Sequence, residues 1–347
     1  VSSDSSIILR PRTNLVNRCE ITKPLHELLK EARSKLRLGL RSFRTCLLSR
    51  HLLDIRQASL HYEQIYSILL SRISKFAQLT NHKYMRSIFL FLFFVSTLSM
   101  LGQYQTDMDV QYTSKTDGYS VERCKLDIYY PMKTSGMPVV IWFHGGGLTG
   151  GQKSIPDGLK DAGFIVVAPN YRLIPNVKID DCIDDAAEAV AWVFNNIKEY
   201  GGDSSKIFVS GHSAGGYLTS MIGLDKKWLK NYEIEADSIA GLIPYSGQAI
   251  THFAHRRINN IPELQPTVDE YAPLFHIRKE APPYIIITGD EDLELYGRYE
   301  ENLYLWRMLK LVGHPDVQIF KLDGHNHGDM VSPAHHILKQ QIKRLIQ

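Results

Sequence analysis

Residues 206–216 read K-I-F-V-S-G-H-S-A-G-G, and this stretch guides the interpretation of the whole chain. Its apolar run I-F-V (207–209) predicts a buried strand. The G-x-S-x-G pattern at 211–215 follows, and it is typical of a tight strand-to-helix turn that lifts a serine hydroxyl clear of a sheet. Glycine suits both flanking positions because a Cβ would collide with the crowded backbone there. Ser213 is therefore the candidate nucleophile.

The remaining chain predicts a sheet in which strands alternate with helices. Helical periodicity is strongest over 180–200, and a shorter helix is expected over 155–162. Such alternation favours a mostly parallel sheet that is covered on both faces. Residues 247–280, interrupted by three prolines, are expected to form a small cap or insertion over the sheet edge. The expected strands are 110–114, 125–130, 138–143, 164–168, 206–210, 238–245, 284–288 and 317–322.

A glycine-rich stretch directly after the predicted strand 138–143 is the candidate oxyanion hole. It reads H-G-G-G over His144–Gly147, and glycine lets backbone N–H groups approach a substrate closely. A flexible loop or a phosphate-binding turn is the alternative. Neither a G-x-G-x-x-G helix start nor a P-loop follows, so we favour the oxyanion hole.

A general base and an orienting acid are expected after the last two strands. His327 is the preferred base, and His325 is its competitor. Asp292, third after Gly289, is the preferred acid, and Asp290 is the alternative. No acidic or His-rich partner accompanies the two histidines, so a metal site is not expected.

Together these motifs resemble the α/β-hydrolase superfamily, most closely its hormone-sensitive-lipase-like esterases and their bacterial relatives. The resemblance covers about residues 126–345. It implies an α/β-hydrolase fold and no cofactor or metal. It implies Ser213 as nucleophile, with Asp292 and His327 completing a triad. The N–H groups of Gly146, Gly147 and Ala214 would form the oxyanion hole.

The chain of 347 residues is expected to have three parts. Residues 1–84 carry about nine more Lys and Arg than Asp and Glu, which leaves the remainder acidic by about six, given the net charge of +3. This basic extension is expected to lie outside the fold. Residues 85–102 open with Met-Arg, continue as an apolar run and predict a signal peptide. Residues 103–347 are expected to form the catalytic domain.

The expected function is that of a secreted or periplasmic serine carboxylesterase acting on short-chain acyl esters through an acyl-enzyme. Its partner would be a small-molecule ester, with an acylated sugar as one option, and neither nucleic acid nor stable membrane insertion after signal cleavage. Alternatives are a carbohydrate acetyl or feruloyl esterase of the same fold, a serine peptidase, or a binding protein that has lost catalysis.

Charged residues outside these motifs are expected to be structural. Glu300 and Glu301 are expected to share a charged helix surface with Arg298 and Arg307. This interpretation assigns them no role near the candidate site.

Overall fold

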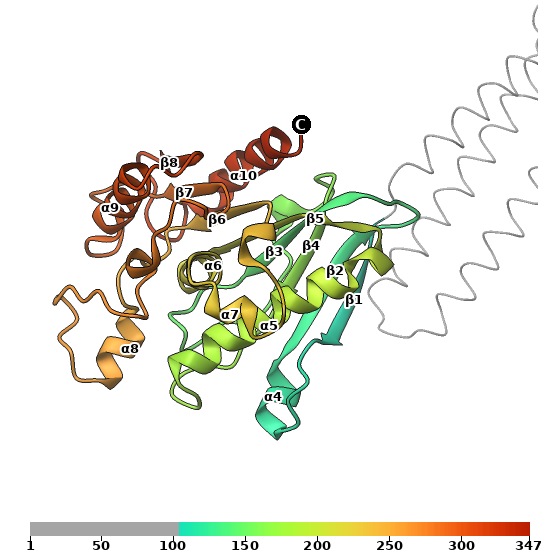
Figure 1. The fold of residues 1–347 in the computed structure, drawn as a ribbon, viewed down its shortest axis with the longest axis horizontal. Coiled ribbons are helices and arrows are strands. Elements are labelled where there is room, and N and C mark those ends of the chain that lie inside the picture. Colours follow the sequence, from blue (N-terminus) through green and yellow to red (C-terminus); the bar gives the residue numbers. More distant parts are fainter. Residues whose placement is uncertain (1–103) are drawn as a thin grey trace, which may run out of the picture. The chain divides into compact units, whose positions relative to one another are not determined.

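A computed structural model describes residues 104–347. The predicted basic extension (1–84) and signal peptide (85–102) lie outside the described residues. Eight strands form one sheet (Figure 1). They are β1 (Tyr104–Gln111), β2 (Lys125–Pro131), β3 (Met137–Phe143), β4 (Ile165–Pro169), β5 (Gly202–His212), β6 (Gly241–Tyr245), β7 (Tyr284–Thr288) and β8 (Val317–Lys321).

The sheet has the strand order β1-β2-β4-β3-β5-β6-β7-β8. The pairs β1–β2 and β2–β4 are antiparallel, whereas every pair from β4–β3 to β7–β8 is parallel. This arrangement confirms the predicted mostly parallel sheet. Parallel strands all end at the same edge, so the loops after β3, β5, β6, β7 and β8 are brought together there.

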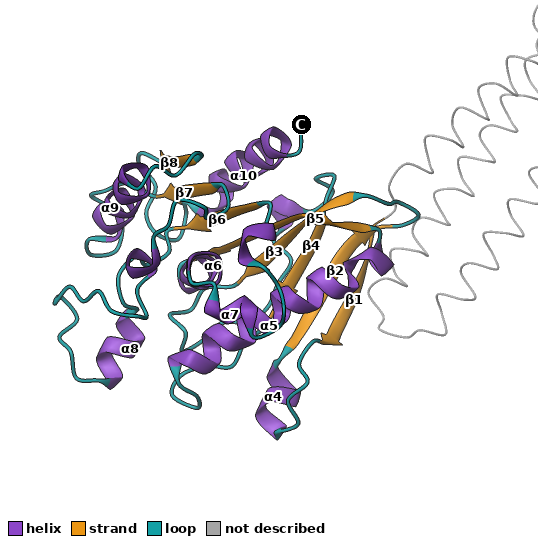
Figure 2. Ribbon diagram, in the orientation of Figure 1, coloured by secondary structure: helices purple, strands orange, loops and turns teal. Residues whose placement is uncertain are grey.

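Helices connect the strands (Figure 2). The α-helices are α4 (Gly118–Arg123), α5 (Ile179–Asn196), α6 (Ala214–Leu224), α7 (Lys227–Lys230), α8 (Phe253–Ile258), α9 (Arg298–Leu311) and α10 (Val331–Leu345). Short 3-10 turns are η1 (Asp157–Leu159), η2 (Ile197–Tyr200), η3 (Ala236–Ser238) and η4 (Pro273–His276). Among residues 104–347, no helix combines the length and apolar character needed to cross a membrane.

Two apolar cores lie on opposite faces of the sheet, as the alternation along β3 shows. Val139, Ile141 and Phe143 point into the core that α5, α6 and α9 cover. Val140 and Trp142 point into the core that α10 covers. Successive side chains of a strand face opposite sides, so a continuous apolar run requires cover on both. The predicted double covering is therefore confirmed.

Two predicted elements are wrong in detail. The helix expected over 155–162 is only the single turn η1, in a segment that contains Pro156 and Gly158. A Cβ on Gly158 would lie 2.6 Å from the ring of His335, so this turn packs closely on α10. The strand expected over 110–114 is β1, which ends at Gln111 and carries few apolar residues.

Candidate active site

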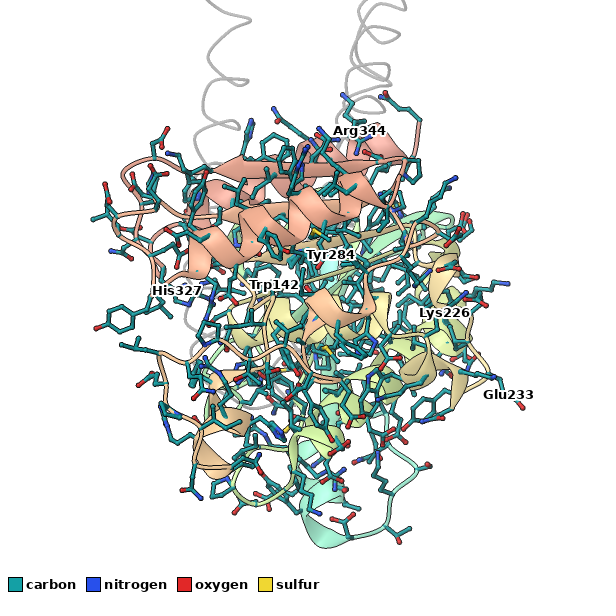
Figure 3. All side chains as sticks on the ribbon, turned by 60° about the vertical axis from the view of Figure 1, so that its left-hand side comes forward. Trp142, Lys226, Glu233, Tyr284, His327 and Arg344 are labelled. Atoms are coloured by element: carbon teal, nitrogen blue, oxygen red, sulfur yellow. The ribbon has the colours of Figure 1, made fainter. Side chains whose placement is uncertain are left out.

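Polar side chains from several loops meet at the carboxyl edge of the sheet. Ser213 follows β5, His327 follows β8, and the loop after β7 carries the acidic residues. In Figure 3, His327 lies on the opposite side of the molecule from Lys226 and Glu233. These two residues follow the end of α6, which starts at the carboxyl edge and runs back along the sheet. The predicted candidates are thus placed where a parallel sheet exposes its functional edge.

Ser213 occupies a strained turn between β5 and α6. Its φ is 57° and its ψ is −114°, a conformation that a non-glycine residue rarely adopts. The surrounding backbone is crowded, because a Cβ on Gly215 would lie 2.1 Å from the carbonyl oxygen of Phe143. The Ser213 amide donates to the carbonyl of Tyr245 at 2.9 Å. The elbow predicted from the G-x-S-x-G pattern is present, and it aims a serine at the sheet edge.

His327 connects Ser213 to a carboxylate. Its Nε2 lies 2.9 Å from the Ser213 Oγ, and its Nδ1 lies 2.8 Å from Oε2 of Glu294. An ionised carboxylate can only accept, so Nδ1 carries the proton and donates it to Glu294. The Nε2 lone pair then faces the Ser213 hydroxyl. This tautomer is the one that a general base for serine requires.

The Glu294 carboxylate is fully buried and saturated with donors. Besides His327, its Oε2 accepts from the backbone amide of Leu295. Its Oε1 accepts from the Ser246 hydroxyl at 2.5 Å and from the Gly289 amide at 3.1 Å. Burial alone would raise the pKa of Glu294, but hydrogen bonds from His327, Ser246 and Gly289 outweigh burial and lower the pKa to about 2. The carboxylate is therefore ionised at neutral pH.

The structure does not bring the predicted acids to His327. Asp292 is exposed, and its amide donates to the side chain of Asp290. Asp290 accepts from the amide of Gly324 at 2.7 Å and so holds the loop that carries His327. A helical turn from 290 to 294 explains the difference, since the Glu294 amide donates to the Asp290 carbonyl at 2.9 Å. The carboxylate beside the imidazole is Glu294, which replaces Asp292 in the site.

The competing histidine also lies apart from Ser213. His325 is exposed and faces the carboxylate of Asp329 at 3.5 Å. Of the two histidines, the structure therefore brings only His327 to the nucleophile. Among the described residues, no group of three His, Cys, Asp or Glu side chains is arranged to hold a metal ion.

The glycine loop after β3 lies against the nucleophile. A Cβ on Gly145 would lie 3.4 Å from the Cβ of Ser213. Gly146 and Gly147 have φ values of 109° and 64°, which favour glycine. Within residues 104–347, the amides of Gly146, Gly147 and Ala214 donate to no protein acceptor. Backbone donors without partners beside a serine are what an oxyanion would require.

Buried aromatic and basic side chains hold this glycine loop. The ring of His144 stacks on that of Tyr171 at 4.4 Å, and the Tyr171 hydroxyl donates to the His144 carbonyl at 2.9 Å. Arg123 donates to the carbonyls of Tyr171 and Gly151 at 2.9 and 2.6 Å. Phe253, in the insertion, reaches within 2.9 Å of where a Gly147 Cβ would lie. The insertion therefore packs directly on the glycine loop, as a cap would.

His212, which precedes the nucleophile, supports the loop of the base. Its Nε2 donates to the carbonyl of His327 at 2.7 Å, and the two rings lie 4.6 Å apart. Burial, reinforced by the neighbouring His327, lowers the pKa of His212 to about 4. A neutral His212 keeps its Nε2 proton for this bond. Its role depends on a contact across 115 residues, which the sequence motif does not reveal.

Buried neutral histidines predict a loss of stability in acid. Burial lowers the pKa of His144, His212 and His335 to about 4, and that of His252 well below its usual value. Below pH 6.5 the unfolded chain binds protons that the folded chain refuses, so stability falls as the pH falls from about 6.5 to about 4. Each pKa unit corresponds to about 1.4 kcal/mol, so the shifted histidines together account for a loss that is large relative to the marginal stability of a domain.

Thermal unfolding midpoints of the full chain between pH 7.5 and 4 measure this effect. We expect the unfolding midpoint to decline steeply below pH 6.5. The decline should be shallower in His335→Gln, because glutamine removes one of the buried titrating groups. His335 lies on α10 and is not part of the candidate site. The exposed neighbour gives the matched control, His336→Gln. A midpoint that stays constant down to pH 4.5 would contradict the prediction.

Comparison with known proteins adds sequence and fold relatives. Residues 126–254 match the BD-FAE protein family. "Probable isoprenylcysteine alpha-carbonyl methylesterase ICMEL1" of Oryza sativa subsp. japonica is 28% identical over 236 residues, covering 60% of this chain and 55% of that protein. "Probable carboxylic ester hydrolase LipM" of Mycobacterium tuberculosis is 31% identical over 184 residues, covering 46% of this chain and 42% of that protein. The chain thus spans about half the length of these curated relatives.

Solved structures share the fold. A truncated carbohydrate esterase from gut microbiota has a TM-score of 0.59 at 18% identity, covering 70% of this chain and 96% of that one. Thermogutta terrifontis esterase 2, phosphonylated by sarin, has a TM-score of 0.57 at 21% identity, covering 69% of this chain and 95% of that one. At these identities the likeness concerns the fold alone.

Proposed function

We propose that this chain is a hormone-sensitive-lipase-like esterase of the α/β-hydrolase superfamily, and that it is a serine carboxylesterase that works through an acyl-enzyme; the matched family and the esterase relatives support this proposal. One observation carries the proposal: His327 Nε2 lies 2.9 Å from Ser213 Oγ, while its Nδ1 is held by Glu294 at 2.8 Å. The base is thereby within hydrogen-bond reach of the nucleophile on one side and of the orienting carboxylate on the other.

In the proposed reaction, Ser213 Oγ attacks the ester carbonyl carbon while its proton passes to His327 Nε2. The negative charge that develops on the carbonyl oxygen is received by the free amides of Gly146, Gly147 and Ala214. The imidazolium, stabilised by the Glu294 carboxylate, returns the proton to the departing alcohol oxygen. A water molecule then attacks the acyl-enzyme with His327 again as base, and the carboxylic acid leaves.

For the substrate, we propose a small ester with a short acyl group. The contact between Phe253 and Gly147 supports this choice, because it places a bulky side chain of the insertion directly beside the glycine loop. An acylated sugar is the alternative alcohol, suggested by the carbohydrate esterase of similar fold. A panel of acetylated and feruloylated sugars beside simple esters of matched acyl length would separate the two readings.

We also propose that the enzyme is exported. The motivation is the apolar run of residues 87–101 after Met85 and Arg86, which has the composition of a signal peptide. N-terminal sequencing of the exported protein tests this proposal, and an N-terminus upstream of Met85 would count against it.

The esterase proposal is tested by turnover and covalent labelling of the full chain. We expect hydrolysis of p-nitrophenyl acetate, and we expect a fluorophosphonate to attach to the peptide that contains Ser213 and to abolish turnover. Labelling on another residue would assign the nucleophile elsewhere. A protein that neither hydrolyses the ester nor takes the label would end the serine-hydrolase proposal.

A further inference from the structure

Ser246, directly after β6, touches both partners of the nucleophile. Its side chain is fully buried, and its Oγ lies 2.5 Å from Glu294 Oε1 and 3.1 Å from His327 Nδ1. The carboxylate can only accept, so the Ser246 hydroxyl donates its proton to Oε1. A lone pair of the same oxygen is then left to face the Nδ1–H of His327. One hydroxyl thus bridges the carboxylate and the imidazole.

The Ser246 backbone is held in an unfavourable conformation by buried groups. Its φ of 45° lies in the left-handed region that disfavours non-glycine residues. Its amide donates to the carbonyl of Ile287 at 2.7 Å, and its own carbonyl accepts from the buried guanidinium of Arg298 at 2.5 Å. Asn302, also buried, donates to the next carbonyl, that of Gly247, at 2.8 Å. Such strain persists only where surrounding contacts over-determine it.

Helix α9 supplies these contacts, which corrects an expectation from the sequence. The side chains of Arg298 and Glu301 are largely buried rather than part of a charged surface, and Arg298 Nε lies 2.7 Å from Glu301 Oε1. Glu301 Oε2 in turn accepts from the amides of Ala249 and Ile250 at 3.1 Å. A buried ion pair that binds backbone on both sides fixes the start of the cap segment relative to α9.

The same segment contacts the nucleophile's turn. The carbonyl of Tyr245 accepts from the Ser213 amide at 2.9 Å. On the other side of Ser246, a Cβ on Gly247 would lie 2.5 Å from the backbone of Gly216 in α6. Residues 245–247 therefore pack on the turn that holds Ser213, while the side chain of Ser246 engages the acid and the base.

We propose that Ser246 is a positioning residue, whose buried hydroxyl locks the Glu294 carboxylate and the His327 imidazole in register with the turn that carries Ser213. This role rests on the proposed esterase function. Without the hydroxyl, the carboxylate loses one of its donors and can rotate, so the Nδ1–H bond that orients the imidazole loosens. The step that suffers is proton transfer, not substrate binding.

Kinetics of two substitutions in the full chain test the inference. Ser246→Ala and Ser246→Gly both remove the hydroxyl, but glycine relieves the left-handed backbone strain and alanine does not. With p-nitrophenyl acetate we expect both variants to lose about 10- to 100-fold in kcat, as for a hydrogen bond to a charged group, with KM within about twofold of wild type. We expect the glycine variant to unfold at a higher temperature than the alanine variant.

Comparison of activity with stability distinguishes positioning from packing. If the hydroxyl positions the site, kcat falls alike in both variants despite their different unfolding temperatures. A merely structural serine would make kcat follow the unfolding temperature, which would overturn the inference. The matched control is Ser210→Ala, a buried serine in β5 that donates to the carbonyl of Ile243 at 2.6 Å and should leave kcat unchanged.

A proton NMR measurement adds a readout that packing alone would not move. The Nδ1–H of His327 should give a low-field resonance in the wild type, and we expect it to shift upfield or broaden in both Ser246 variants. Variants with wild-type kcat and an unchanged resonance would remove Ser246 from the mechanism and leave the esterase proposal intact. A wild type that lacks turnover would instead overturn the esterase proposal and this inference together.

Discussion

We expect the Ser213→Ala variant to lose about 10⁶-fold in kcat with p-nitrophenyl acetate. Alanine removes only the hydroxyl oxygen, so the strained turn with φ 57° and the Ser213 amide bond to Tyr245 can persist. With the nucleophile gone, His327 has no proton to accept and no acyl-enzyme can form. The activity that remains would come from the free backbone amides and from binding alone.

The decisive control is the fold of the variant. Circular dichroism and the unfolding temperature should match those of the wild type, since the elbow glycines and their contacts are untouched. Ser210→Ala removes another buried hydroxyl, three residues before Ser213 and within β5, and should retain full turnover. A Ser213→Ala protein that keeps even about a tenth of wild-type turnover would place the chemistry on a different residue.

The sequence predicted most of the sheet because its strands are buried on both faces. Such strands leave continuous apolar runs that end at glycine or proline, as 138–143 does before its glycine loop. The exceptions are elements with little apolar signal. β1 is an edge strand with five of its eight residues exposed, and the segment 155–162 is too interrupted by proline and glycine to form more than one turn.

The candidate site was predictable only where glycine marks it. Ser213 and His327 lie beside glycines that a tight turn requires, so chain order alone could place them after their strands. Glu294 has no such marker. The chain forms a helical turn from Asp290 to Glu294, and this turn places the side chain of Glu294, rather than that of Asp292, beside His327. Ser246 enters through a tertiary contact with Glu294, 48 residues away, which no local pattern encodes.

A comparison of two acids provides the sharpest test of the assigned site. We expect Glu294→Gln to lose about 10⁴-fold in kcat. The amide cannot offer acceptors to both His327 and Ser246, and it lacks the charge that stabilises the imidazolium. Asp292→Asn changes an exposed side chain, so its kcat should stay within about twofold of wild type.

A graded substitution shows that geometry as well as charge is needed. In the wild type, the Glu294 carboxylate lies 2.8 Å from His327 Nδ1. Glu294→Asp keeps the carboxylate but shortens the side chain by one methylene, which moves the carboxylate away from the imidazole. We expect an intermediate loss of about 10- to 100-fold, because a misplaced orienting group still provides its charge. Steady-state kinetics of the three variants at neutral pH should show a loss of kcat that increases from Asp292→Asn to Glu294→Asp to Glu294→Gln. The reverse order, with Asp292→Asn the most impaired, would restore Asp292 as the acid.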